Sequence, residues 1–150
     1  MFNSKIITKK SIPAMSFVAL IMVLQGCTDS VNLNNKDSDT QRWYSQAQVE
    51  QGEQIFQENC ASCHGSKAQA KPDWRVADSR GIYPPPPLNG KAHAWHHPFD
   101  MLKVTIAKGT QRGMPGWEDK LDEKQIEATI AWIESHWPDK VYQAWLRRHQ

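Results

Sequence analysis

A pair of cysteines followed directly by a histidine is the strongest chemical pattern in the chain, Cys60-Ala61-Ser62-Cys63-His64. Residues three apart share one face of a helical turn, so two thiols at this spacing can bond the two vinyl groups of one haem. The histidine that follows can turn its imidazole toward the iron as an axial ligand. The pattern therefore predicts one covalently bound haem c, with Cys60 and Cys63 as attachment sites and His64 as an iron ligand.

Two other uses of a Cys-x-x-Cys pair have to be weighed against haem. A dithiol redox motif requires a context of alternating strands and helices, whereas the flanks of this pair have helical patterns. A structural zinc site requires four ligands, usually from two such pairs, and the sequence contains a single pair. A histidine adjacent to a cysteine also gives poor tetrahedral geometry. Haem attachment is the interpretation that the flanks favour.

A methionine in a loop of glycine and proline is the second chemical pattern, Gly113-Met114-Pro115-Gly116. A thioether sulfur binds haem iron well and raises the reduction potential relative to a second histidine. Glycine and proline hold a loop in which the sulfur is free of helical constraints. We predict that Met114 is the sixth ligand, because Met101 lies in a helical pattern and is expected to fill the core.

Three histidines surround a tryptophan between the two patterns and offer an alternative ligand set: His93, His96 and His97 around Trp95. One of them could replace the methionine and give bis-histidine ligation. The cluster could also bind a second metal such as copper. The simpler interpretation is polar packing around the tryptophan. The sequence leaves these alternatives open.

The residues around the cysteine motif resemble those of class I cytochromes c. Gly52-x-x-x-Phe56 followed by the haem motif and Gly65 is similar to the first helix and haem site of that family, and the likeness covers residues 43–137. The resemblance implies an all-α fold of three to four helices around one haem. It also implies that the first helix crosses the last helix at Gly52 and Phe56, close to Trp132.

A second part of the resemblance concerns the ligand loops. Pro87-Leu88-x-Gly90 resembles the family's Pro-Leu-x-Gly segment, whose proline carbonyl accepts a hydrogen bond from the axial histidine. Such a bond fixes the tautomer and the orientation of the ligand. The resemblance therefore assigns this role to Pro87. It also implies that electrons enter and leave at a haem edge near Cys60 and Cys63.

Two long helices are expected to position these groups. Ser45 with Gln48 forms a capping box that predicts a helix from about residue 45 to 59. Asp122 with Gln125 predicts a second, which Pro138 ends. Its buried face repeats at helical spacing. The members of that face are Ile126, Ile130, Ile133 and Trp137.

Shorter elements are predicted between and after the two long helices. Residues 66–82 are polar and are expected to form a surface loop, in which Trp74 is the largest apolar side chain. A helix of one or two turns is expected over residues 98–106, and Gly109 ends it. Residues 141–146 could form one more turn that carries Trp145 to the surface.

The N-terminal part of the chain has the composition of an export signal. Three lysines precede a thirteen-residue apolar stretch, which is too short to span a bilayer and typical of a signal peptide. The signal, residues 1–26, ends in Leu-Gln-Gly before Cys27, and this segment resembles a bacterial lipobox. We predict a lipoprotein in which Cys27 is acylated, residues 27–42 are a flexible polar tether, and residues 43–150 are the cytochrome domain.

Charge limits the class of partner. Cleavage before Cys27 would remove three lysines and no acidic residue, which leaves fifteen basic against sixteen acidic residues. A chain so close to neutral does not bind nucleic acid by charge. We therefore expect redox proteins as partners and a lipid anchor at the membrane.

These features predict a monomeric monohaem carrier on the periplasmic side of the envelope of a Gram-negative type of bacterium. It would pass single electrons between a reductase and an oxidase by outer-sphere transfer and would not itself be an enzyme. One alternative is a haem-bearing subunit or docking module of a larger oxidoreductase complex. Another is a haem enzyme or gas sensor whose sixth site opens, which Met114 argues against.

Overall fold

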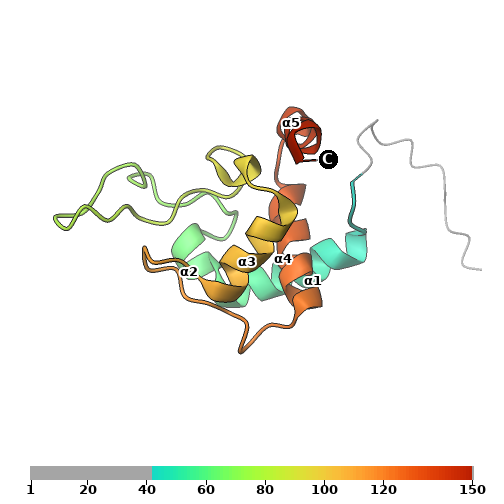
Figure 1. Cartoon of the computed structure of the whole chain (residues 1–150), viewed down its shortest axis with the longest axis horizontal. Coiled ribbons are helices and arrows are strands. Elements are labelled where there is room, and N and C mark those ends of the chain that lie inside the picture. Colours follow the sequence, from blue (N-terminus) through green and yellow to red (C-terminus); the bar gives the residue numbers. More distant parts are fainter. Residues whose placement is uncertain (1–41, 150) are drawn as a thin grey trace, which may run out of the picture. The chain divides into compact units, whose positions relative to one another are not determined.

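The computed structural model describes residues 42–149, which are helical with connecting loops and contain no strand. The predicted signal peptide, Cys27 and the tether up to residue 41 lie outside these residues. Figure 1 shows the arrangement of the helices. In chain order they are α1 (Gln46–Asn59), α2 (Ala61–His64), the 3-10 helix η1 (Ala94–His96), α3 (Phe99–Lys108), α4 (Glu123–Ser135) and α5 (Asp139–His149). The prediction of an all-α fold is confirmed.

Both long helices begin at the residues that the capping boxes predict. The Ser45 side chain accepts a hydrogen bond from the backbone N–H of Gln48, whose side chain accepts one from the Ser45 N–H. Asp122 and Gln125 make the same reciprocal pair at the start of α4. Each box satisfies N–H groups that the first helical turn leaves without a partner.

The crossing of α1 and α4 is the central contact of the fold. A Cβ atom placed on Gly52 would lie 1.9 Å from the Ala128 carbonyl oxygen, so only glycine lets the two backbones approach this closely. One turn further along, Phe56 is fully buried and its ring centroid lies 4.2 Å from that of Trp132. The crossing expected at Gly52, Phe56 and Trp132 is therefore confirmed.

Helix α3 is longer than expected and packs on α4. It covers ten residues and ends at Gly109, as the sequence indicates. Ile106 is its buried residue, in a cluster with Ile126 and Ile130 of α4. Met101, which was expected to fill the core, is instead 49% exposed, because it lies on the outer face of the helix.

Helix α5 corrects the prediction for the C-terminal tail. It covers eleven residues rather than one turn, and Trp145 is only 6% exposed rather than carried to the surface. Its indole N–H donates to the His97 carbonyl oxygen at 2.8 Å. Trp145 belongs to the same core cluster as Trp137 and Tyr142. An aromatic face on α5 thus completes the core beyond the end of α4.

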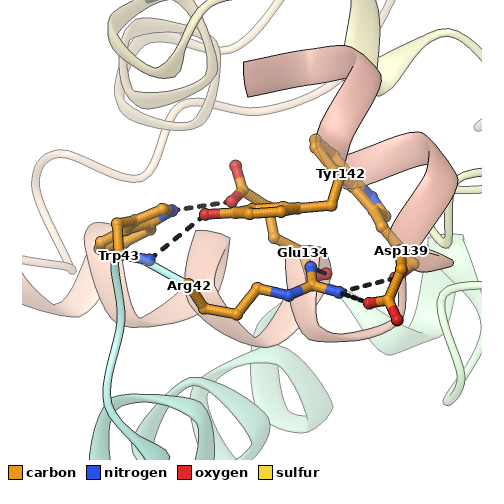
Figure 2. Close-up of polar contacts among 6 residues, drawn as sticks. Arg42, Trp43, Glu134, Asp139 and Tyr142 are labelled. Carbon is orange, nitrogen blue, oxygen red and sulfur yellow. Dashed lines mark hydrogen bonds and ion pairs between the residues drawn. The ribbon is translucent and has the colours of Figure 1, made fainter. Parts of the chain in front are cut away.

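The chain enters the domain through a charged contact with the end of α4 (Figure 2). The Arg42 guanidinium donates to the carbonyl oxygens of Glu134 and Trp137 and pairs with Asp139 at 2.7 Å. Carbonyls at a helix end lack helical partners, and a positive charge there also suits the helix dipole. Arg42, the last residue of the predicted tether, is therefore part of the folded domain.

A buried carboxylate lies next to this contact (Figure 2). Glu134 is fully buried; its Oε2 accepts the indole N–H of Trp43 at 2.7 Å, and its Oε1 has no hydrogen-bond partner. The backbone N–H of Trp43 donates to the Tyr142 hydroxyl at 3.2 Å. Burial raises the pKa of Glu134 to about 7, although the Trp43 hydrogen bond and the nearby Arg42 charge oppose this rise.

Candidate haem site

The Cys-x-x-Cys-His motif forms one helical turn, as its spacing requires. Helix α2 begins after Cys60, and the N–H groups of Cys63 and His64 both donate to the Cys60 carbonyl. The turn ends at Gly65, whose φ of 79° lies in the left-handed region that glycine adopts without strain. Cys60 is half-buried and Cys63 is exposed. Burial, with a smaller contribution from Cys63, raises the pKa of the Cys60 thiol to about 11.

The His64 imidazole is buried and held at one nitrogen. Its Nδ1 lies 2.9 Å from the Pro86 carbonyl oxygen, an acceptor, so the proton is assigned to Nδ1 and the lone pair to Nε2. Burial lowers the pKa of His64, against the opposing influence of the Pro86 carbonyl. A neutral imidazole with an available Nε2 is the form that ligates iron.

The proline that orients the histidine is Pro86, and the assignment of this role to Pro87 is wrong by one residue. Successive carbonyls of an extended proline run point in different directions, with three residues per turn, so one of them faces the imidazole. Pro87 is buried, whereas Pro86 is partly exposed. The sequence offers four chemically similar carbonyls at residues 84–87 and no local signal that separates them.

Two further hydrogen bonds fix the segment that carries Pro86. The Trp137 indole N–H donates to the Leu88 carbonyl oxygen at 2.7 Å, and the Leu88 N–H donates to the Ala68 carbonyl oxygen at 2.8 Å. The sequence predicts Trp137 only as a buried apolar residue. Through its indole N–H, Trp137 also positions the segment that contains Pro86.

The loop around Met114 folds back on the end of α3. The Thr110 N–H donates to the Met114 carbonyl oxygen at 2.9 Å, and a Cβ on Gly109 would lie 2.4 Å from that oxygen. The Met114 side chain is partly buried against the cluster that contains Ile106 and Ile126, whereas Cys60 packs in the other cluster. The structure thus brings the His64 side chain into contact with Pro86. The Met114 side chain packs on a different core cluster from the one that Cys60 contacts.

The histidines after the proline segment pack as polar neighbours. The rings of Trp95 and His96 meet edge to face at 4.1 Å between centroids, and those of His93 and His97 at 5.8 Å. Within residues 42–149, no three His, Cys, Asp or Glu side chains are grouped so that they could hold a metal ion. The structure therefore supports polar packing for this cluster.

The donor set fits haem c. Two thiols three residues apart on one turn suit the two vinyl groups, and a buried neutral imidazole with its Nδ1 engaged suits an axial ligand. Both thiols lie in the described part of the chain as free cysteines. Cys60 and Ala61 of this turn pack against the core cluster that contains Phe56 and Trp132.

Comparison with known proteins agrees with this chemistry. A family described as "Cytochrome C oxidase, cbb3-type, subunit III" matches residues 47–133. The chain is 30% identical over 105 residues to the cbb3-type cytochrome c oxidase subunit CcoP of Azospirillum brasilense, a match that covers 69% of this chain and 31% of that protein. It is 32% identical over 84 residues to the cbb3-type cytochrome c oxidase subunit FixP of Bradyrhizobium sp. (strain ORS 278), covering 56% and 26%.

The extent of these matches is limited to one part of the relatives. The chain spans about a quarter to a third of the length of the curated proteins that it matches. No solved structure matches the chain. The matched region includes the haem motif, Met114 and most of α4.

Proposed function

This chain belongs to the cbb3-type cytochrome c oxidase subunit III family, and on that premise we propose that it is the haem-bearing electron-transfer subunit of an oxidase complex. The similarity to CcoP and FixP favours this assignment over a carrier that diffuses freely between partners. The observation that carries the proposal is the buried His64 imidazole, whose Nδ1 is held by Pro86. An electron carrier requires such a fixed ligand, because electron transfer is fast when the geometry of the iron ligands changes little between the two oxidation states.

The residues of the chain would divide the work as follows. Cys60 and Cys63 would hold the haem through thioether bonds, each thiol adding its sulfur to one carbon of a vinyl group and its hydrogen to the other. His64 would hold the iron through Nε2 and Met114 would hold it through its sulfur. When bound, haem supplies an iron atom that changes between the ferrous and ferric states. With the iron held by both residues, the chain would pass electrons and would not itself be the site of oxygen chemistry.

A single haem per chain is part of the proposal, because the sequence contains one Cys-x-x-Cys-His motif. Covalent attachment is tested by denaturing the purified protein, extracting it with acidic acetone and recording the pyridine haemochrome of the chain. We expect one haem to stay with each chain. Haem that leaves in the acetone would contradict attachment at Cys60 and Cys63.

We also propose a lipid anchor at Cys27, on the periplasmic side of the membrane. Within residues 42–149, none of the helices has the length and apolar character to cross a membrane. Support for the anchor comes from the apolar stretch followed by Leu-Gln-Gly-Cys27. The Cys27→Ser variant should lose incorporation of labelled fatty acid. A mature mass equal to polypeptide plus one haem would contradict acylation.

Assembly is tested by native electrophoresis of membranes solubilised in mild detergent, followed by haem staining and detection of the chain. As an oxidase subunit, the wild-type chain should migrate together with oxygen-reducing activity in one band. If all of the protein migrated as a free monomer, the assignment to a complex would be refuted. The interpretation as a freely diffusing electron carrier would then be favoured.

A further inference from the structure

A long loop leaves the helices between the axial histidine and its hydrogen-bond acceptor. We call residues 66–85 the projecting loop; they follow Gly65 and precede Pro86. Figure 1 shows this green segment extending away from the helices of the domain. The haem chemistry described above uses none of its side chains. Its position nevertheless makes it the segment that connects His64, the predicted iron ligand, to Pro86, whose carbonyl orients that ligand.

The base of the projecting loop is fixed to the haem site. The Ala70 N–H donates to the His64 carbonyl oxygen at 2.7 Å, and the Ala68 carbonyl oxygen accepts from Leu88. Both alanines are buried and have positive φ values, 52° and 60°. Residues other than glycine adopt positive φ values at a cost in free energy, and such strained conformations persist where the surrounding contacts require them. The loop therefore starts from a defined position and not from a flexible joint.

Residues 78–82 of the loop form a closed turn. The Asp78 carboxylate accepts hydrogen bonds from the backbone N–H groups of Arg80 and Ile82 and forms an ion pair with the Arg80 side chain at 2.8 Å. The backbone N–H of Asp78 in turn donates to the Ile82 carbonyl oxygen at 2.9 Å. These bonds organise the turn before any partner binds, which lowers the entropy cost of association.

Large apolar side chains are exposed on this ordered loop. Val76 is 65% exposed, Tyr83 57% and Ile82 40%. Trp74, in the same loop, is partly buried, and the Arg75 guanidinium lies 4.5 Å from its ring centroid. Exposed apolar side chains that include a tyrosine, together with an arginine, are typical of protein interfaces.

The charge of the loop indicates the charge of its partner. Four basic residues and two acidic ones lie in residues 66–85. The basic residues are Lys67, Lys71, Arg75 and Arg80, and all four are exposed. Since Arg80 is paired with Asp78, the surplus positive charge comes from Lys67, Lys71 and Arg75, with Asp73 as the one remaining acidic residue. An acidic surface around an apolar pocket would complement this pattern.

We propose that the projecting loop docks the cytochrome domain onto another protein subunit, by inserting Val76, Ile82 and Tyr83 into an apolar cleft rimmed by carboxylates. The proposal rests on the proposed function as an oxidase subunit. We choose a protein partner because the proposed function places the chain in an oxidase complex. The net positive charge of the loop would also suit an anionic lipid surface, and the vesicle experiment below separates the two.

The test compares two pairs of exposed apolar residues. Val76→Glu with Ile82→Glu alters the projecting loop. Met101→Glu with Val104→Glu is the matched control, since these α3 side chains are 49% and 59% exposed. Each full-length holoprotein is first checked for its haem spectrum and melting temperature. Native electrophoresis of solubilised membranes then measures the fraction of each chain that migrates with the oxidase band.

We expect the loop variant to lose more than about tenfold in this fraction and the α3 variant to match the wild type. The single change Lys71→Glu should weaken association, and more strongly at low salt than at high salt. Equal comigration of wild type and loop variant would overturn the docking proposal and leave the proposed function intact. A wild-type chain that fails to comigrate would refute the proposed function, on which docking depends.

Sedimentation with phosphatidylglycerol vesicles addresses lipid directly. The Cys27→Ser holoprotein, with and without the two loop changes, is mixed with the vesicles. We expect the loop changes to leave the sedimented fraction unaltered. A loss of vesicle binding that depends on Val76 and Ile82 would assign the loop to lipid and overturn the protein-docking proposal.

Discussion

The indole N–H of Trp137 donates to the carbonyl oxygen of Leu88 at 2.7 Å and so connects the end of α4 to the segment that orients His64. Trp137 is 2% exposed, so the bond is shielded from water. Removal of the donor would leave the Leu88 carbonyl, in a partly buried position, without this partner, which costs about 1–3 kcal/mol. The bond therefore bears on both stability and the geometry of the iron ligand.

The Trp137→Phe variant tests this connection. We expect a loss of about 1–3 kcal/mol in the free energy of unfolding, measured with urea, and a shift in the reduction potential of the haem. Trp145→Phe is the matched control, because it removes an indole N–H that donates to His97, away from the proline segment. The control should lose stability without a shift in potential. Equal potentials in both variants would contradict the positioning role.

Substitution of Gly52 should force α1 and α4 apart. Ala has a helix propensity about 1 kcal/mol better than Gly, yet its Cβ would lie 1.9 Å from the Ala128 carbonyl oxygen. Backbone atoms cannot yield as a side chain would, so we expect Gly52→Ala to lower stability and Gly52→Leu to cost about 1–3 kcal/mol or more. Gln51→Leu, on the exposed face of α1, is the control. Wild-type urea midpoints for both Gly52 variants would rule out the close crossing.

Met114→Ala tests the sixth ligand. The oxidised protein should show the weak far-red band of iron bound to a methionine sulfur, and the variant should lose it. The variant should also have a lower potential and bind carbon monoxide in the ferrous state. Met101→Ala is the control, since that side chain lies on the outer face of α3. Loss of the band in the control alone would overturn the assignment.

Glu134 should make the stability of the domain depend on pH. Its pKa is raised in the folded protein from 4.5 to about 7, so the folded state holds the proton more tightly than the unfolded state. The stability linked to this proton is fully present below pH 4.5 and is lost as the pH rises through about 7. One pKa unit corresponds to about 1.4 kcal/mol, so the loss is about 3 kcal/mol.

The Glu134→Gln variant isolates this contribution. Its side chain does not titrate, so urea unfolding at about pH 5 and about pH 8.5 should show a much smaller difference than in the wild type. Glu53→Gln, on the exposed face of α1, should retain the wild-type difference. An unchanged pH dependence in Glu134→Gln would mean that another group is responsible.

Local signals in the sequence predict the elements with local causes. Ser45 and Asp122 begin their helices because the caps depend on residues three positions away. Gly52 and Phe56 predict the crossing because a glycine lowers the stability of a helix interior. A close approach of another backbone is a reason for a glycine at such a position. The turn at Cys60–His64 follows from motif spacing. The match to an oxidase subunit family supports the haem chemistry that this motif predicts.

Features that depend on distant parts of the chain could not be predicted in the same way. Pro86 and Pro87 have the same chemistry, and only the tertiary position of His64 selects one carbonyl. The burial of Trp145 depends on an aromatic cluster that forms between α4 and α5. Glu134 shows the same limit, because its partner Trp43 is 91 residues away in the chain.

The crossing of α1 and α4 also governs the order in which the domain can fold. Gly52 lies near the start of the domain and Ala128 near its end, with the haem motif and the projecting loop between them. Contacts between residues so far apart require closure of a long loop, and such closure slows folding. A nascent chain that has not yet produced α4 cannot pack Phe56 against Trp132. The Cys60–His64 turn is therefore synthesised long before the core that shields it can exist.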